Sequence, residues 1–226
     1  MASPPSLLAG RAVVVTAGGT REPIDPIRYL GNRSSGRMGN ALAVAAAERG
    51  AVVTLVTTAA APVRPDVEVV TVETAAAMSA AVRAALPGAA ALIMAAAVAD
   101  HRPAQVSAQK LKKRETLTLE LVPTVDILRS LIGDPLREGL FTVGFAAETE
   151  DMVANASRKL VEKQLDLIVL NDVSRADVGM GSDDNEVTVI DAGGVVAAIA
   201  RRPKQLVAAA LLDLIETRLL PDGRPR

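Results

Sequence analysis

The stretch that decides the fold runs from Val13 to Gly39 and reads VVVTAGGTREPIDPIRYLGNRSSGRMG. Its apolar β-branched start is typical of a buried parallel strand, and this strand stops at Gly18 and Gly19. A polar loop with Pro23 and Pro26 is expected next, and a second turn of small residues, 34–36, then opens an alanine-rich helix. A strand, a glycine turn and a helix N-terminus form the anion site of many α/β proteins. The sequence therefore predicts a phosphate-binding edge, with more polar residues than a plain dinucleotide site needs.

Strands and helices alternate along the rest of the chain, which predicts an α/β fold with a Rossmann-like parallel sheet flanked by helices. The expected core strands are Val13–Thr16, Val52–Val56, Val67–Val72, Ala91–Ala97, Phe141–Phe145 and Leu165–Leu170. The expected helices span residues 36–49, 74–86, 125–132, 150–164 and 204–219. Residues 117–121 alternate as a half-exposed strand does, and residues 186–190 and 195–199 flank a hairpin turn. We therefore also expect a small antiparallel extension.

Composition limits the class of protein. The chain has 226 residues, half of them hydrophobic, which suits a single domain over residues 1–226. The net charge of −1 argues against a general nucleic-acid coat protein, and the absence of cysteine excludes disulfides and fits a cytoplasmic location. The apolar runs are short, so no membrane span is expected. We expect disorder at about residues 1–9 and 221–226.

A second candidate site follows the fourth expected strand, in Met94–Pro103. Ligands of open α/β sheets bind beyond the carboxyl ends of the strands, and small side chains there let a flat base or sugar approach the backbone. Asp100 could accept a hydrogen bond from a sugar hydroxyl or face a metal ion, or it could simply cap a turn. His101 is the only histidine and is more simply explained as a surface residue.

Basic and aromatic residues further along the chain could complete a nucleotide site. The cluster Lys110–Arg114 would ordinarily be a solvated surface, but its loop leaves the same sheet edge as Asp100. Such a loop could close over a polyphosphate and neutralise its charge. Phe145, at the end of the fifth strand, is either a core residue or a stacking surface for a base. Lys159 and Lys163 share one helix face, where they could equally be surface lysines.

The residues alone leave two other functions open. A nicotinamide-dependent reductase would need a G-x-G-x-x-G turn and an acidic residue after the second strand, or a Tyr-x-x-x-Lys pair. That strand instead ends at Thr57 and Thr58, and the only tyrosine, Tyr29, is followed by Arg33 four positions later. The second alternative is a non-catalytic nucleotide-binding module, which predicts nucleotide affinity without turnover.

Taken in order, these motifs resemble the phosphopantothenoylcysteine synthetase family over about residues 11–220. The matching blocks are Thr16–Tyr29, Asn32–Gly39, Ala96–Asp100, Lys110–Lys113, Val143–Thr149, Asn171–Ser174 and Gly181–Asn185. Two positions depart from the family pattern, Val125 where proline is common and Met180 where phenylalanine is usual. Both are backbone or packing positions, so we expect the activity to survive.

The resemblance implies a ligase reaction in coenzyme A biosynthesis that has two steps. The carboxylate of 4′-phosphopantothenate attacks the α-phosphate of CTP and gives an acyl-cytidylate and pyrophosphate. The amine of cysteine then attacks the acyl carbon and releases CMP. The resemblance also implies Mg²⁺, whose ligands stay open, and the choice of CTP over ATP comes from the bacterial members alone.

The resemblance assigns roles to particular residues. Asn32 and Lys110 are the implied catalytic residues. The implied CTP-binding residues are Met94, Ala95, Ala96, Asp100, Lys110, Val125, Asp126, Ile127, Leu128, Phe145, Lys159 and Lys163. The implied residues for phosphopantothenate and the acyl-cytidylate are Gly18, Gly19, Asn32, Ser34, Ser35, Gly36 and Ala97.

The resemblance also implies partners. We expect a homodimer with the site near the interface, and residues 117–121 and the hairpin at Gly193 are the candidate dimer surfaces. In the full-length bacterial protein a flavin-dependent decarboxylase domain would precede Met1. We expect no flavin in the present domain and no nucleic-acid or membrane partner.

Overall fold

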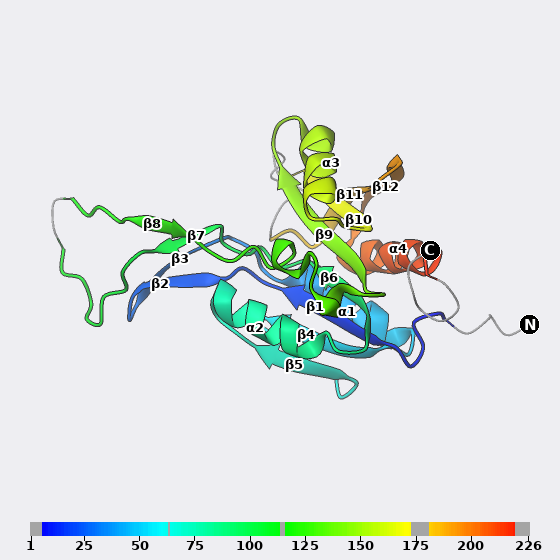
Figure 1. The fold of residues 1–226 in the computed structure, drawn as a ribbon, viewed down its shortest axis with the longest axis horizontal. Coiled ribbons are helices and arrows are strands. Elements are labelled where there is room, and N and C mark those ends of the chain that lie inside the picture. The colour runs from blue at the N-terminus through cyan, green and yellow to red at the C-terminus, as the bar shows by residue number, and fades with distance from the viewer. Residues whose placement is uncertain (1–5, 63, 114–115, 173–180, 220–226) are drawn as a thin grey trace, which may run out of the picture.

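The computed structural model describes residues 6–62, 64–113, 116–172 and 181–219. An eight-stranded sheet forms its centre (Figure 1). The strands of this sheet are β1 (Ala12–Ala17), β4 (Val52–Thr57), β5 (Val67–Thr71), β6 (Ala89–Met94), β9 (Phe141–Glu148), β10 (Leu167–Asp172), β11 (Asp184–Asp191) and β12 (Gly194–Pro203). Their spatial order is β12-β11-β10-β9-β6-β1-β4-β5. Neighbouring strands from β10 to β5 in this order pair in parallel, whereas β11 pairs antiparallel with both β10 and β12. The predicted Rossmann-like sheet is confirmed.

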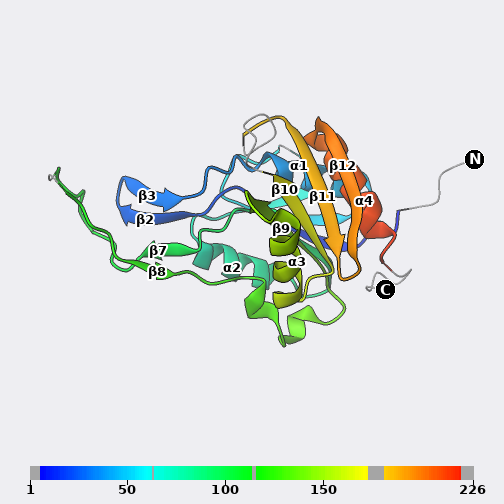
Figure 2. The same cartoon turned by 90° about the horizontal axis from the view of Figure 1, so that it is seen from above.

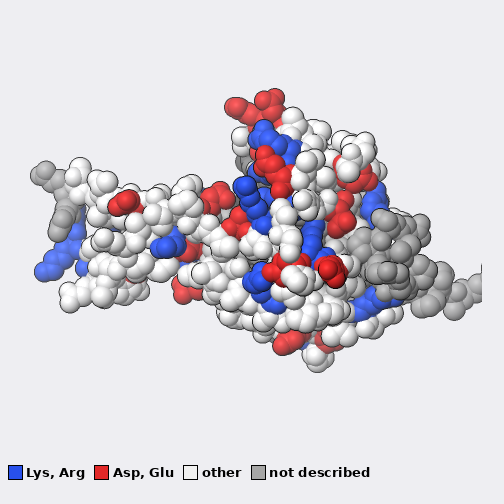
Figure 3. Space-filling view, in the orientation of Figure 1, with Lys and Arg blue, Asp and Glu red and all other residues white. Residues whose placement is uncertain are grey.

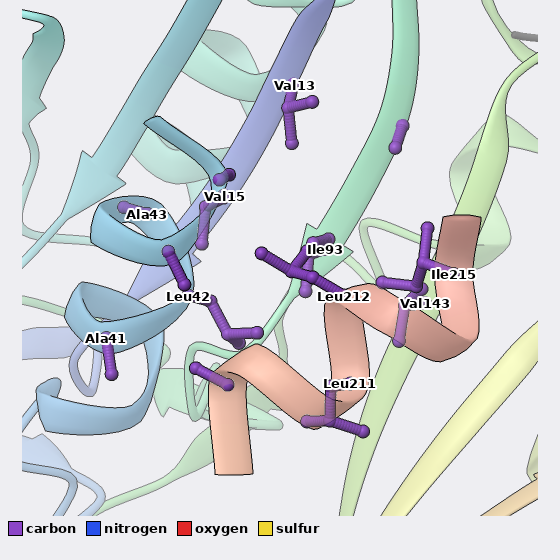
Figure 4. Close-up of a cluster of buried hydrophobic side chains, with 14 of the residues drawn as sticks. Val13, Val15, Ala41, Leu42, Ala43, Ile93, Val143, Leu211, Leu212 and Ile215 are labelled. Carbon is purple, nitrogen blue, oxygen red and sulfur yellow. The ribbon is translucent and has the colours of Figure 1, made fainter. Parts of the chain in front are cut away.

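Two helices cover each face of the sheet. The helices are α1 (Arg37–Glu48), α2 (Ala75–Ala85), α3 (Met152–Glu162) and α4 (Lys204–Glu216). Leu42 of α1 and Leu212 of α4 join one buried cluster over β1 and β6 (Figure 4), whereas α2 and α3 contribute to a second cluster. Val15 belongs to the first cluster and Val14 to the second, because successive strand residues point to opposite faces. Both faces are covered, which explains the continuous apolar run in β1.

Two small hairpins project from the carboxyl end of the sheet, and we call them together the arm (residues 21–31 and 101–123). The first pairs β2 (Arg21–Asp25) with β3 (Arg28–Gly31), and the second pairs β7 (His101–Pro103) with β8 (Leu121–Pro123). Figures 1 and 2 show the arm extending away from the body. The first hairpin was not predicted, because Pro23 and Pro26 suggest a loop.

Several sequence predictions need correction. The strand expected at residues 117–121 is wrong, since β7 has only three residues and pairs with Leu121–Pro123. The strand expected to reach Ala97 ends at Met94, because Ala97 instead bridges to Gly19 beside β1. The helix expected at 125–132 is reduced to the 3₁₀ turn η1 (Arg129–Leu131). A second 3₁₀ turn, η2 (Pro135–Arg137), follows outside this range.

The predictions for the chain ends can be compared with the structure only where it describes them. Leu8 is fully buried, so from Ser6 onward the expected disordered start packs on the fold. The expected disorder at 221–226 lies outside the described residues, as does Met180. None of the described helices is long and apolar enough to cross a membrane.

Candidate functional site

A cleft of about 480 Å³ lies at the carboxyl ends of the parallel strands. The sheet order reverses between β1 and β6, and doubly wound sheets bind ligands at this switch point. The cleft is lined by Asn32, residues 34–39, 94–100, 124–128 and 145–147, Lys159, Lys163, Asn171, Gly181, Asn185 and Lys204. It therefore brings together the implied CTP-binding residues other than Lys110. The implied acyl-substrate residues other than Gly18 and Gly19 also line it.

Two buried threonines join the β1 and β6 edges of the cleft. The Thr16 hydroxyl accepts a hydrogen bond from the Ala96 N–H at 3.1 Å, and the Thr20 hydroxyl accepts one from the Ala99 N–H at 2.9 Å. Both threonines are fully buried. The segment 95–99 is thus held against the loop that follows β1. Its side chains are small, and the segment lines the cleft.

Asn32 is oriented by this same segment. Its Nδ2 donates to the Ala97 carbonyl at 3.2 Å and to the Val98 carbonyl at 3.3 Å. Both amide hydrogens are used, so the acceptor oxygen Oδ1 is the atom left for a ligand. The structure therefore presents Asn32 as a hydrogen-bond acceptor on the cleft wall.

Gly18 and Gly19 do not line the cleft, in contrast to the implied contact with the acyl substrate. A side chain at Gly18 would have its Cβ 2.2 Å from the Thr58 hydroxyl oxygen, and Gly18 has a φ of +86°. A Cβ at Gly19 would lie 2.6 Å from the Asn32 carbonyl oxygen. These glycines let the loops pack closely, so their effect on the site is to place Asn32.

The N-terminus of α1 opens onto the cleft. Gly36 is its N-cap and has no side chain to cap the helix, and no acidic residue stands in the first turn. The Ser34 hydroxyl accepts a hydrogen bond from the Gly36 N–H at 3.4 Å. The free N–H groups and the helix dipole favour an anion here. The phosphate-binding edge expected from the sequence is therefore available at Ser34–Gly36.

Four cations line the cleft, and each is held in place. Lys159 pairs with Glu148 at 2.6 Å, Lys163 with Asp126 at 3.0 Å and Arg37 with Asp183 at 2.8 Å. Lys204 differs, because within the described residues its ammonium donates only to backbone carbonyls, those of Ser182 at 2.6 Å and Asp184 at 2.8 Å. Burial, together with the charge of Arg37, lowers the pKa of Lys204. Three of the four cations of the cleft are thus paired with a carboxylate, and Lys204 is bound to backbone.

Sequence reasoning missed Lys204 and Arg37. Lys204 is the first residue of α4 and Arg37 the first of α1, and in the sequence both look like ordinary surface residues. Arg37 also donates to the Gly181 carbonyl at 2.8 Å, so both cations hold the segment that leads into β11. The polar motif Gly181–Asn185 was the one signal that pointed to this wall.

The structure also places the other candidate residues that the sequence singled out. Phe145 is half-buried on the cleft wall and packs against the core, and its role as a stacking surface for a base stays a prediction. Asp100 is exposed, and no partner for its carboxylate lies within the described residues. His101 is an exposed residue of β7 outside the cleft. The described residues include no group of three acidic or histidine side chains that could hold a metal ion.

Lys110 lies apart from the cleft. It lines a shallow groove on the arm with Arg28, Leu111, Lys112, Lys113 and Leu117. Figure 3 shows basic side chains at the outer end of the arm. The structure of one chain therefore does not bring Lys110 to the other predicted site residues.

Known proteins share this fold and sequence. The family described as DNA/pantothenate metabolism flavoprotein C-terminal domain matches residues 8–219. The chain is 43% identical over 220 residues to the coenzyme A biosynthesis bifunctional protein CoaBC of Vibrio cholerae, covering 95% of this chain and 54% of that protein. It is also 43% identical over 223 residues to CoaBC of Escherichia coli strain K12, covering 96% of this chain and 54% of that protein.

A solved structure gives the same result. The crystal structure of the C-terminal domain of CoaBC matches with a TM-score of 0.77 at 37% identity, covering 94% of this chain and 97% of that domain. The chain spans about half the length of the curated relatives it matches. It belongs to the family of DNA/pantothenate metabolism flavoprotein C-terminal domains.

Proposed function

We propose that this chain is a phosphopantothenate–cysteine ligase that works through an acyl-cytidylate. The observation that carries the proposal is the cleft, in which Asn32, the 94–100 edge, Phe145 and two lysines meet at the switch point of the sheet. Membership of the family and identity to the CoaBC proteins support it. In the full-length protein a decarboxylase domain would accompany this one, and we place the reaction in the cytoplasm.

The first step joins two anions, and the cleft offers charge for both. A carboxylate oxygen of phosphopantothenate attacks the α-phosphorus of CTP, and the bond to the pyrophosphate oxygen breaks. Lys159, Lys163 and the α1 N-terminus would hold the phosphates and stabilise the charge that develops on them. The Ala95–Ala97 backbone and the face of Phe145 would receive the nucleoside.

Magnesium would arrive with the nucleotide. Mg²⁺ in nucleotide sites is held mainly by phosphate oxygens with one or two carboxylates, so a cluster of three protein ligands is not required. Asp100 is exposed on the cleft wall, and its carboxylate has no hydrogen bond or ion pair within the described residues, which suits this role. The bound ion would neutralise phosphate charge.

The second step uses the orientation of Asn32. The amine of cysteine attacks the acyl carbon, the bond to the CMP oxygen breaks, and the nitrogen loses a proton. Asn32 Oδ1 could accept a hydrogen bond from the attacking amine, because its Nδ2 is occupied by the Ala97 and Val98 carbonyls. Aspartate in its place cannot donate to these carbonyls, so the acceptor oxygen would lose its orientation and this step would slow.

We also propose that the active form is a homodimer in which Lys110 of one chain serves the cleft of the other. Five of the eleven exposed large apolar side chains in the described residues lie on the arm, namely Ile27, Tyr29, Val106, Leu117 and Leu121. An exposed apolar surface of this kind is typical of an interface. Val195, beside the Gly193 hairpin, is also exposed and remains the second candidate surface.

The reductase alternative finds no support in the site. Tyr29 lies on the arm, where its ring stacks 5.2 Å from the Arg21 guanidinium, and it is outside the cleft. Turnover distinguishes the ligase from a non-catalytic module, which would bind the nucleotide without converting it.

The experiment is pyrophosphate release with phosphopantothenate and Mg²⁺, run in parallel with CTP and with ATP. The ligase proposal predicts release with CTP and, after cysteine is added, phosphopantothenoylcysteine and CMP. Nucleotide binding without pyrophosphate release would support the non-catalytic module instead. A spectroscopic titration with NADPH serves as the control for the reductase.

A further inference from the structure

Two buried carboxylates on the described part of the arm have no role in the proposed mechanism. That of Glu22 accepts a hydrogen bond from the N–H of Ala75, the first residue of α2, at 2.8 Å. The other is that of Asp25. The residue is 3% exposed, although it lies on a narrow two-hairpin projection. Its Oδ1 accepts the N–H of Ile27 at 3.0 Å and that of Arg28 at 2.9 Å. These two bonds close the turn between β2 and β3, as aspartate commonly does in turns. Turn formation therefore accounts for one of its two oxygens.

The second oxygen of Asp25 reaches the other hairpin. Oδ2 accepts the N–H of Leu111 at 3.0 Å, and it also accepts bonds from Nε and Nη2 of Arg28. The same Arg28 Nη2 donates to the Leu111 carbonyl at 2.9 Å. Both backbone groups of Leu111 are thus bound, and Leu111 directly follows Lys110. A turn alone would not require these bonds.

The segment so held is a long one. Residues 104–120 connect β7 to β8, and loops of this length without regular structure usually carry a function. Nearer β7, the Ser107 N–H donates to the Ile24 carbonyl at 3.0 Å, so the two hairpins are joined at two points. The Arg28 guanidinium holds the pKa of Asp25 well below its usual range. The carboxylate therefore stays ionised, and bonds to a charged acceptor are stronger than neutral ones.

We propose that Asp25 is a positioning residue of the ligase reaction: by binding Leu111 it fixes the backbone beside Lys110 and presents that lysine to the triphosphate. The proposal rests on the proposed function, since it assumes that Lys110 takes part in the reaction. Asp25 itself touches no substrate, and its effect on catalysis passes through Lys110.

The test is a double-mutant cycle on the full chain with Asp25→Asn and Lys110→Gln. Asparagine keeps Oδ1 for the turn but puts an NH₂ group where Oδ2 faces the Leu111 N–H and Arg28. We expect D25N to lower kcat/KM for CTP by about tenfold in the wild-type background and by less than about twofold in K110Q, because coupled residues are non-additive. Asp66→Asn is the matched control, since Asp66 also pairs with an arginine, Arg64 at 2.6 Å, but on the body.

Each outcome decides the proposal. An equal loss from D25N in both backgrounds, or a folded D25N with wild-type kcat/KM, would contradict it. Thermal melting and light scattering show whether D25N is folded and keeps its oligomeric state. If D25N fails to fold, Asp25→Ser goes through the same cycle, because serine can still accept a turn bond but does not reach Leu111. Loss of the fold in both variants would make Asp25 a structural residue and overturn the positioning role.

The wild-type measurement in the same cycle separates the two proposals. Wild-type protein without pyrophosphate release would contradict the ligase function, and the positioning role would fall with it. Active wild-type protein with additive effects would contradict the positioning role alone.

Discussion

The cleft and the arm both lie at the carboxyl end of one sheet, yet they are built differently. In the cleft, Lys159, Lys163 and Arg37 each have a carboxylate partner, and two buried threonines hold the walls. On the arm, no ion pair with Lys110 or its neighbours Lys112 and Lys113 occurs among the described residues, and apolar side chains face outward. The cleft is therefore held together within one chain, whereas the arm exposes apolar side chains and lysines without an ion-pair partner among the described residues.

This difference predicts that variants of the two regions fail at different steps. Lys110→Gln should lower pyrophosphate release by about a hundredfold, because a positioned cation stabilises charge in the first step. Asn32→Asp should leave pyrophosphate release largely intact and stop the second step, so the acyl-cytidylate accumulates in the presence of cysteine. Pyrophosphate assays combined with mass spectrometry distinguish these cases. Near-normal activity of K110Q would remove Lys110 from the site.

The sequence could predict the cleft better than the arm, for a physical reason. Asp100 lies in the segment after β6, and Phe145 lies on the neighbouring strand β9; the carboxyl ends of such parallel strands meet at one edge. The distance between Lys110 and that edge depends on how the two hairpins pack against each other, and the hydrophobic periodicity of the sequence does not predict this packing. The proline-containing segment after Gly19 suggested a loop, although a two-stranded edge hairpin tolerates proline.

The hydrogen bonds of the buried side chains Lys204 and Asp25 could not be predicted from the sequence either. Lys204 binds two carbonyls that lie about twenty residues earlier in the chain, and Asp25 binds a backbone N–H 86 positions later. Local pattern predicts elements and turns, but such long-range polar bonds follow only from the tertiary packing.

A smaller effect is expected on the free energy of unfolding, which a lysine substitution in the cleft should lower more than one on the arm. Lys204→Met should destabilise the body by about 1–3 kcal/mol, because the Ser182 and Asp184 carbonyls lose their buried donor. Lys112→Met on the arm should leave the free energy of unfolding nearly unchanged, because Lys112 is exposed. Urea unfolding measures both variants. Equal stability of K204M and wild type would mean that these carbonyls find other partners.

The smallest effect concerns pH. The pKa of Asp25 is lowered in the fold, chiefly by Arg28, from an unfolded value of about 3.9. Its contribution to stability is therefore fully present above about pH 5 and is lost as the pH falls through and below about 4. The stability gap between wild type and D25N should be constant from pH 8 to pH 5 and should narrow below. A gap that changes between pH 8 and pH 6 would contradict this assignment.

We propose that the reaction needs the cleft of one chain and the arm of another, and subunit complementation is the decisive test. K110Q and N32D are each expected to make little product alone. When equal amounts are co-expressed and assembled at random, half of the dimers are mixed, and each mixed dimer has one site with an intact Asn32 and an intact Lys110 from the other chain. We predict recovery of about a quarter of wild-type product formation, as the two-fold symmetry requires. Recovery no higher than that of the parent variants would contradict the claim and place Lys110 in the cleft of its own chain.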